Sequence, residues 1–169
     1  EEPSKKGSPG SAGPVSALSG KVGPENLALL VFDSHFDAIP PALRASWGTA
    51  PAFDGGDLCG AFLAGLIEGG AILPEHLFVA GVSDFPHGAA ADTAFGRAYL
   101  SLIGRGAKVY PKSEVRRPDF GARLERDLAA VSARTLYVSL DADAGASSAC
   151  PAVRFSDAVG LSEEELSSL

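Results

Sequence analysis

Two short acidic segments hold the side chains of this 169-residue chain that are best suited to chemistry. The first, residues 33–37, reads Asp-Ser-His-Phe-Asp, and the second, residues 141–143, reads Asp-Ala-Asp. Alternate side chains of an extended backbone lie on the same side, so each segment would present its ionisable groups together. If the two segments are neighbours in the fold, four carboxylates and one imidazole converge: Asp33, His35, Asp37, Asp141 and Asp143.

Such a group of side chains points to a metal site. Four ionised carboxylates cannot share one site without a compensating charge, because each raises the pKa of its neighbours. One or two divalent cations would supply that charge. Oxygen ligands with one imidazole suit Mn²⁺ or Mg²⁺, although Zn²⁺ or Co²⁺ could compete on affinity, and two ions could present a shared hydroxide to an electrophilic carbon. The alternative is that these acids only cap helices and line a polar strand end.

Each acidic segment directly follows a short, mainly apolar run. Residues 27–32 (Leu-Ala-Leu-Leu-Val-Phe) end at Asp33, and residues 135–140 (Thr-Leu-Tyr-Val-Ser-Leu) end at Asp141. Runs of this kind are typical of strands buried on both faces of a parallel sheet. Ligands of open parallel sheets bind outside the carboxyl ends of the strands, so both acidic segments lie where a site is expected.

Further strands and helices alternate along the chain. Apolar runs predict two more strands, a strong one at residues 77–82 and a weaker one at 107–110. Apolar side chains repeated every three or four residues predict helices over residues 58–66, 89–103 and 120–131. This alternation predicts an α/β domain with a mainly parallel sheet and right-handed crossovers.

The two ends of the sequence have patterns of their own. Residues 1–24 are rich in Gly, Pro and Ser, so we expect a loop or flexible lead-in there, followed by a single domain over residues 25–169. Ser162 and Glu165 have the spacing of a capping box. Because a helix would begin there only a few residues before the sequence stops, we expect the domain to be truncated.

Composition argues against several classes of function. Hydrophobic residues make up 46% and charged residues 21%, which is ordinary for a globular protein. The net charge of −7 argues against a nucleic-acid binder or a binder of anionic membranes. The longest apolar stretch, residues 58–67, is about half of the roughly 20 residues that a membrane span needs. Two cysteines are too few for a disulfide framework and no secretory signal is visible, so we expect a cytoplasmic protein.

The two acidic segments resemble the signatures of one enzyme family, the ureohydrolases (arginase, agmatinase and formiminoglutamase). Residues 33–37 are similar to the Asp-Ala-His-x-Asp motif of that family. The second segment resembles its Ser-x-Asp-x-Asp motif, which a proline and then Gly-Gly-Leu follow. The matching residues here are Ser139, Asp141, Asp143, Pro151, Gly160 and Leu161. Residues 59–69 also resemble the helix that opens with His-Gly-Thr-x-Phe, so the resemblance extends over most of the chain from Leu27 onward.

The resemblance implies a three-layer α/β/α fold with a mainly parallel, arginase-like sheet and a centre of two Mn²⁺ ions. It implies hydrolysis of a C–N bond in a small guanidino or formimino substrate by a hydroxide that bridges the ions, in a trimer or hexamer. Asp33 and Asp141 would bridge the ions, Asp37 would bind the first ion, and His35 and Asp143 would bind the second. Family members are longer, so the resemblance also implies truncation at both ends.

Three positions depart from the family pattern. Gly10 stands where the family has a histidine ligand of the first ion, so that site would be weakened or lost. Cys59 stands at the position of a proton-shuttling histidine, where a thiol could act as an acid or be an apolar filler. Arg154 replaces a glycine beside the site, and its charge favours an acidic substrate or none. These changes leave open a catalytically inactive relative that binds one ion or none and has a structural or regulatory role.

Two further histidines carry weaker expectations. His76 lies in Pro-Glu-His just before a predicted strand, so we expect an exposed turn residue. His87 follows the strand at 77–82 on the same side of the sheet as the acidic segments. It could line a pocket, replace the missing histidine ligand or do neither.

Overall fold

A four-stranded parallel sheet forms the centre of the molecule. The computed structural model describes residues 12–40, 42–43, 60–146, 149 and 160–167. The strands are β1 (Leu27–Phe32), β2 (Leu77–Val82), β3 (Lys108–Pro111) and β4 (Thr135–Leu140). Their order is β3-β2-β1-β4, and every neighbouring pair runs parallel, so the predicted parallel α/β sheet is confirmed.

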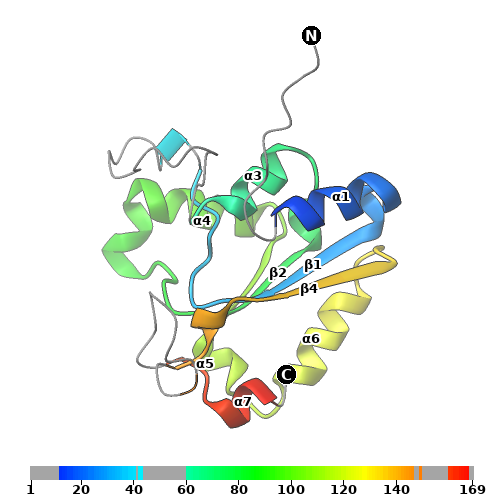
Figure 1. Cartoon of the computed structure of the whole chain (residues 1–169). Coiled ribbons are helices and arrows are strands. Elements are labelled where there is room, and N and C mark those ends of the chain that lie inside the picture. The colour runs from blue at the N-terminus through cyan, green and yellow to red at the C-terminus, as the bar shows by residue number, and fades with distance from the viewer. Residues whose placement is uncertain (1–11, 41, 44–59, 147–148, 150–159, 168–169) are drawn as a thin grey trace.

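Helices cover both faces of the sheet and give the three layers expected (Figure 1). One side carries α1 (Ala12–Val22), α3 (Phe62–Glu68) and α4 (Ala94–Gly104). The other side carries α5 (Lys112–Val115), α6 (Phe120–Ala129) and α7 (Glu163–Ser167). Short 3₁₀ turns lie at Pro24–Asn26, Pro74–His76, Gly88–Asp92 and Ala142–Ala144. None of the described helices is both long and apolar enough to span a membrane.

The alternating side chains of β1 divide the interior into two cores. Leu29 and Val31 pack with buried residues of the layer that contains α1, α3 and α4. Leu30 and Phe32 pack on the opposite face, together with Phe120 of α6. All six residues of β1 are buried, as predicted for a strand covered on both faces. The other interior strand, β2, is buried at all six residues in the same way.

The chain changes direction across the sheet next to β1. It passes from β1 through β2 to β3 and then returns to place β4 on the other side of β1. The carboxyl ends of β1 and β4 therefore meet at a topological switch point, where open α/β sheets usually bind ligands. The Asp141 N–H donates to the Phe32 carbonyl at 2.8 Å, which holds the two strand ends together.

The prediction that β4 is buried on both faces was wrong. Its residues alternate between half-buried and exposed, and Leu136, Val138 and Leu140 are 46%, 54% and 60% exposed. The reason is position, since β4 is an edge strand of the described sheet. An apolar run shows that side chains can be buried, but not that a neighbouring element covers them.

Residues 12–22 form a helix where we expected a loop. Pro14 lies in the first turn of α1, where a missing backbone N–H breaks no helical hydrogen bond. Val15 and Ser19 are buried, and Val15 belongs to the core below the helix. Glycine and proline counts therefore misled the prediction, because packing of one face stabilises this helix despite poor local propensity.

Helix boundaries differ from the predictions in two other places. The helix expected over residues 58–66 is observed at Phe62–Glu68, with Gly60 and Ala61 before it. The helix expected over residues 89–103 is divided into a 3₁₀ turn and α4, which begins after Thr93. The Thr93 hydroxyl accepts the N–H of Gly96 at 3.0 Å and so caps α4. The capping box at α7 is confirmed, because Ser162 and Glu165 exchange both side-chain to backbone bonds, at 2.7 and 3.1 Å.

Candidate metal centre

A glycine in β2 allows the end of β1 to come close. The Asp33 N–H donates to the Ala80 carbonyl at 3.0 Å, which extends the pairing of the two strands by one residue. The next residue of β2, Gly81, has a φ of 104°, and a Cβ there would lie 3.1 Å from the Asp33 carbonyl oxygen. Glycine adopts this conformation without strain. Gly81 therefore sets the place where Asp33 leaves the sheet.

Both acidic segments turn in the same way as they leave the sheet. The carboxylate of Asp33 accepts the N–H of His35 at 2.7 Å, and that of Asp141 accepts the N–H of Asp143 at 3.1 Å. These turns, in which an aspartate bonds to the backbone two residues on, replace the extended conformation that we expected. The predicted extended backbone was therefore wrong. The pairs of residues that the alternation placed together, Asp33 with His35 and Asp141 with Asp143, are nevertheless linked by these turns. Asp37 ends the first segment with a φ of 47°, which is uncommon for a residue other than glycine.

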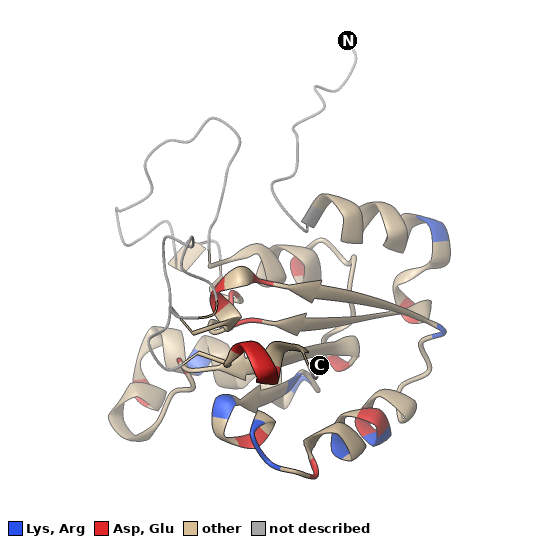
Figure 2. Cartoon of the chain, turned by 60° about the horizontal axis from the view of Figure 1, so that its bottom comes forward, with Lys and Arg blue, Asp and Glu red and all other residues tan. Residues whose placement is uncertain are grey.

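Ser34 and His35 join the first segment to the second. The Ser34 hydroxyl donates to the Asp143 carbonyl at 2.8 Å. His35 Nδ1 lies 3.1 Å from Asp143 Oδ2 and 3.8 Å from Asp33 Oδ1. One potential ligand atom from each of Asp33, His35 and Asp143 lies within 4.8 Å of the others. Acidic residues gather where β1 and β4 end (Figure 2).

The pKa values of these four groups are shifted by burial, by repulsion between carboxylates and by hydrogen bonds. Burial, together with the charge of Asp37, raises the pKa of Asp33 to about 9, and burial raises the pKa of Asp37 to about 6. The hydrogen bond to Asp143 raises the pKa of His35 to about 9. Burial also acts to raise the pKa of Asp143, but the hydrogen bond and charge of His35 outweigh it and leave that pKa below its usual value. At neutral pH this gives a protonated Asp33 beside an imidazolium–carboxylate pair.

Asp33 is the most deeply buried of the candidate ligands. It is 1% exposed, and its Oδ2 has no hydrogen-bond partner within the described part of the chain. A buried oxygen without a partner costs free energy, and a cation at this position would remove that cost. Carboxylates with one imidazole are a suitable donor set for Mn²⁺ and similar divalent ions. The residues present therefore fit a metal ion.

Asp37 and Asp141 lie near this group without joining it. Asp141 is exposed, and its carboxylate is engaged with the Asp143 N–H. Asp37 is half-buried, and its carbonyl accepts the N–H of Leu63 at the start of α3 at 3.0 Å. The charges of both residues act to raise the pKa of Asp33, so the four carboxylates share one electrostatic environment. Three of the five predicted ligands thus come together closely.

A second contact of the chain supports the segment that contains Asp143. Leu161 forms an isolated parallel bridge with Gly145, with hydrogen bonds of 2.8 Å to the Ala144 carbonyl and 2.7 Å from the Ala146 N–H. A Cβ on Gly160 would lie 2.3 Å from backbone atoms of this loop, so only glycine fits. The Gly-Leu pair noted in the sequence therefore packs directly behind the second acidic segment.

Several predicted positions lie outside the described residues: Gly10, Cys59, Pro151 and Arg154. His87 is exposed, packs against Phe85 with ring centroids 5.1 Å apart and the ring planes tilted by 37°, and does not belong to the close ligand group. His76 corrects the expectation of an exposed turn residue. It is 3% exposed, and its Nδ1 lies 3.1 Å from the Leu27 carbonyl oxygen, so it supports the start of β1.

Sequence reasoning missed Asp84. It follows β2 by two residues, and its Oδ2 accepts the N–H of Phe36 within the first acidic segment at 3.3 Å. The rule that sites lie at the carboxyl ends of parallel strands singled out His87 after this strand, but it applies equally to Asp84, which lies closer to the strand end.

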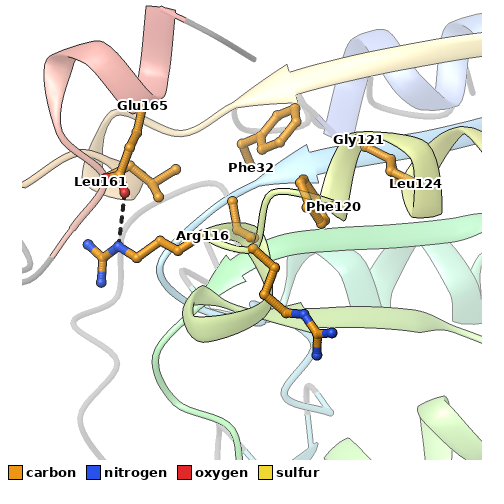
Figure 3. Close-up of a pocket in the computed structure, with 9 residues that line it drawn as sticks. Phe32, Arg116, Phe120, Gly121, Leu124, Leu161 and Glu165 are labelled. Carbon is orange, nitrogen blue, oxygen red and sulfur yellow. Dashed lines mark hydrogen bonds and ion pairs between the residues drawn. The ribbon is translucent and has the colours of Figure 1, made fainter.

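A cavity of about 330 Å³ lies on the α6 side of the sheet (Figure 3). Phe32, Phe120, Leu124 and Leu161 contribute apolar side chains to its lining. Arg116 and Glu165 also line it, and they form an ion pair at 3.0 Å. None of the candidate metal ligands lines this cavity, so it is separate from the metal centre.

Comparisons with known proteins agree with the fold. The arginase family matches residues 11–169. Among solved structures, formimidoylglutamase from Bacillus subtilis superposes with a TM-score of 0.67 at 18% identity, over 92% of this chain and 43% of that one. Arginase from Bacillus subtilis gives 0.65 at 23% identity, over 92% and 52%. Trypanosoma cruzi formiminoglutamase with Mn²⁺ gives 0.66 at 23% identity, over 91% and 46%. The chain thus spans about half the length of these structures, and no curated protein matches it in sequence.

Proposed function

Because this chain belongs to the arginase family, we propose that it is a metal-dependent hydrolase of linear C–N bonds in small guanidino or formimino compounds. The observation that carries the proposal is the convergence of Asp33, His35 and Asp143 at the switch point between β1 and β4. Mn²⁺ is the preferred ion, because oxygen ligands with one imidazole suit it and a structurally similar formiminoglutamase contains it.

Asp33, His35 and Asp143 would hold one ion, and Asp37 and Asp141 would complete a second site beside it. A bound divalent ion supplies Lewis acidity, which polarises the C–N group and makes water a stronger nucleophile at neutral pH. Before an ion binds, Asp33 and His35 must release the protons that their raised pKa values hold. The positive charge of the ion then offsets the repulsion among the carboxylates.

The surrounding residues prepare this arrangement. The bond from Ser34 to the Asp143 carbonyl keeps the two acidic segments at a fixed separation, so the ligands need little rearrangement. Because Asp33 is buried, the dielectric constant around it is lower than in water, and its interaction with a cation is stronger. Cys59 stays a candidate acid for the departing amine, since a thiol can give up a proton near neutral pH when its pKa is lowered.

The test is a substrate screen on the Mn²⁺-loaded protein. Arginine, agmatine, guanidino acids and formiminoglutamate are offered in turn, and the release of urea or formamide is measured. We expect turnover of one of these compounds, and we expect it to disappear in the variants His35→Ala and Asp141→Asn. Absence of product from every compound would contradict the proposed activity.

One observation favours a second candidate, a catalytically inactive family member that binds a single ion. Asp37 and Asp141 do not join the close ligand group, and Asp141 is exposed. A structural or regulatory subunit would need only the group formed by Asp33, His35 and Asp143. One bound ion per chain without turnover would support this candidate, whereas turnover that depends on Asp141 would exclude it.

A further inference from the structure

Asp84 connects β2 to the middle of the first acidic segment. Its Oδ2 accepts the N–H of Phe36 at 3.3 Å. Phe36 separates His35 from Asp37, so this hydrogen bond holds the peptide that lies between two candidate metal ligands. Asp84 itself is not part of the close ligand group.

The hydrogen bond from the Phe36 N–H to Asp84 lies just beyond the last backbone hydrogen bond between the first acidic segment and the chain at the end of β2. At the start of the segment the Asp33 N–H donates to Ala80, and the Ser83 N–H donates to the Ser34 carbonyl at 2.8 Å. Beyond Ser34 the segment leaves β2, and the side chain of Asp84 reaches the next part of it. The carboxylate thus extends the support that the sheet gives to β1.

The side chain of Phe36 is held separately. It is 1% exposed, and its ring centroid lies 4.1 Å from that of Tyr99. Tyr99 in turn contacts Phe85 and Phe95, with ring centroids 5.5 and 5.7 Å away. With its ring fixed in this aromatic group and its N–H fixed by Asp84, residue 36 has little freedom to rotate. The directions of the residues on either side are then fixed as well.

Unsatisfied polar atoms gather around the same residue. In the described part of the chain, the buried side-chain atoms without a hydrogen-bond partner are Asp33 Oδ2, Asp84 Oδ1 and Tyr99 Oη. Burial raises the pKa of Asp84, and burial and the charge of Asp84 raise that of Tyr99. Native proteins leave few such groups, and each calls for an explanation. Three such atoms therefore belong to residues in or next to the first acidic segment.

We propose that Asp84 is a positioning residue of the metal centre, an inference that rests on the proposed function. Its carboxylate fixes the peptide of Phe36, and this peptide directs His35 and Asp37 toward the ion. Loss of the acceptor would let the segment rotate, so the metal would bind more weakly while the two cores stay intact. Residues that orient metal ligands typically affect affinity in this way.

The first measurement is Mn²⁺ affinity by calorimetric titration. Asp84→Ala removes the acceptor, and we expect binding to weaken about 10–100-fold. Asp84→Asn keeps an oxygen acceptor of nearly the same shape, and we expect it to restore most of the affinity. Asp92→Ala, which removes an exposed aspartate of the 3₁₀ turn before α4, is the matched control and should bind as the wild type does. Equal losses in Asp84→Asn and Asp84→Ala would overturn the proposal, because the charge would then be the cause.

The second measurement, on the metal-free protein, separates this proposal from the proposed function. We expect the Phe36 amide to exchange its hydrogen slowly in the wild type and in Asp84→Asn, and roughly fivefold faster or more in Asp84→Ala. If the wild type binds no Mn²⁺, the proposed function fails, and the exchange rate alone decides whether Asp84 holds the segment. Unchanged Phe36 exchange in Asp84→Ala would overturn the positioning role. If that variant does not fold, rapid Phe36 exchange or a large loss of Mn²⁺ affinity in Asp84→Asn would overturn it.

Discussion

The two acidic segments share one backbone turn but differ in their surroundings. In each, an aspartate carboxylate accepts the N–H two residues ahead. Asp33 follows the central strand β1 and is 1% exposed, whereas Asp141 follows the edge strand β4 and is exposed. The residue after each aspartate differs in burial in the same way. Ser34 is buried and its hydroxyl donates to the Asp143 carbonyl, whereas Ala142 is exposed.

This difference shows that the motif determines the turn, while the place of the strand in the sheet determines the chemistry. At the end of a central strand the carboxylate loses water, retains a proton and binds a cation strongly once that proton leaves. At the end of an edge strand the carboxylate stays solvated and can adjust its position. In the proposed metal centre, the first segment would therefore supply the deeply buried ligand, and the second would supply the ligands on the solvent-accessible side.

The largest expected effect comes from neutralising the deep aspartate. Asp33→Asn should weaken Mn²⁺ binding at least about 100-fold. This exceeds the loss of about 10–100-fold that is typical when a residue that only orients a metal ligand is changed. The same variant should raise the free energy of unfolding of the metal-free protein by about 1–3 kcal/mol at pH 8, because the wild type must take up a proton at Asp33 when it folds, far above the ordinary pKa of a carboxyl group, whereas asparagine needs none. Asp141→Asn should change that stability by less than about 0.5 kcal/mol, because Asp141 is exposed. Similar stability effects in the two variants, measured by urea unfolding, would remove the distinction between the segments.

The second prediction concerns pH. The pKa values of Asp33 and His35 are raised to about 9 and that of Asp37 to about 6, so the folded protein binds more protons than the unfolded chain between about pH 4 and 9. The stability of the metal-free protein should therefore fall as pH rises through this range. Saturating Mn²⁺ should reverse the trend, since the ion replaces the protons.

Urea unfolding at pH 5, 7 and 9, with a chelator and with Mn²⁺, measures this dependence. Asp33→Asn should flatten the curve of the metal-free protein, and Asp141→Asn should keep most of its slope. A metal-free wild type that becomes more stable toward pH 9 would show that Asp33 is not the proton-holding group.

The third prediction tests how the end of β1 is placed. Gly81→Ala introduces a Cβ 3.1 Å from the Asp33 carbonyl oxygen at a φ of 104°, and it should destabilise the protein by about 1–3 kcal/mol. Gly104→Ala, at the end of α4 where a Cβ meets nothing within 4 Å, should be neutral or stabilise by up to about 1 kcal/mol. Thermal unfolding of the pair gives the comparison, and equal values would mean that Gly81 does not place Asp33.

The smallest effect is expected from a substitution that makes the first acidic segment resemble the second. Ser34→Ala removes the bond to the Asp143 carbonyl and should cost about 0.5–1.5 kcal/mol of stability, with a modest loss of Mn²⁺ affinity. Ala142→Ser, the reciprocal change at an exposed position, should stay within about 0.5 kcal/mol of the wild type. If Ser34→Ala changes the free energy of unfolding and the Mn²⁺ affinity no more than Ala142→Ser does, the hydrogen bond between Ser34 and Asp143 contributes neither to stability nor to metal binding.

Much of the sheet could be predicted from the sequence, because apolar runs that end in aspartate mark strands and their carboxyl ends at once. The run before Asp33 and the run before Asp141 were both strands, and their neighbourhood in the sheet brought Asp33, His35 and Asp143 together. The edge position of β4 could not be predicted, since burial depends on which elements cover a strand.

Other features depend on contacts between distant parts of the chain. The helix over residues 12–22 forms because Val15 packs in a core made of other elements, which local composition does not reveal. Asp84 and Tyr99 meet the first acidic segment only through the order of the strands and the packing of α4. The turns at Asp33 and Asp141 are local, but an alternating pattern predicts extended backbone, so both were missed.

The most direct test of the metal centre is to count the Mn²⁺ ions that the full chain binds at equilibrium, at pH 8 where proton competition is reduced. We expect saturable binding of at least one ion per chain, and loss of that binding in Asp33→Asn and in His35→Ala. No saturable binding in the wild type, or unchanged binding in both variants, would contradict the assignment of Asp33, His35 and Asp143 as a metal centre.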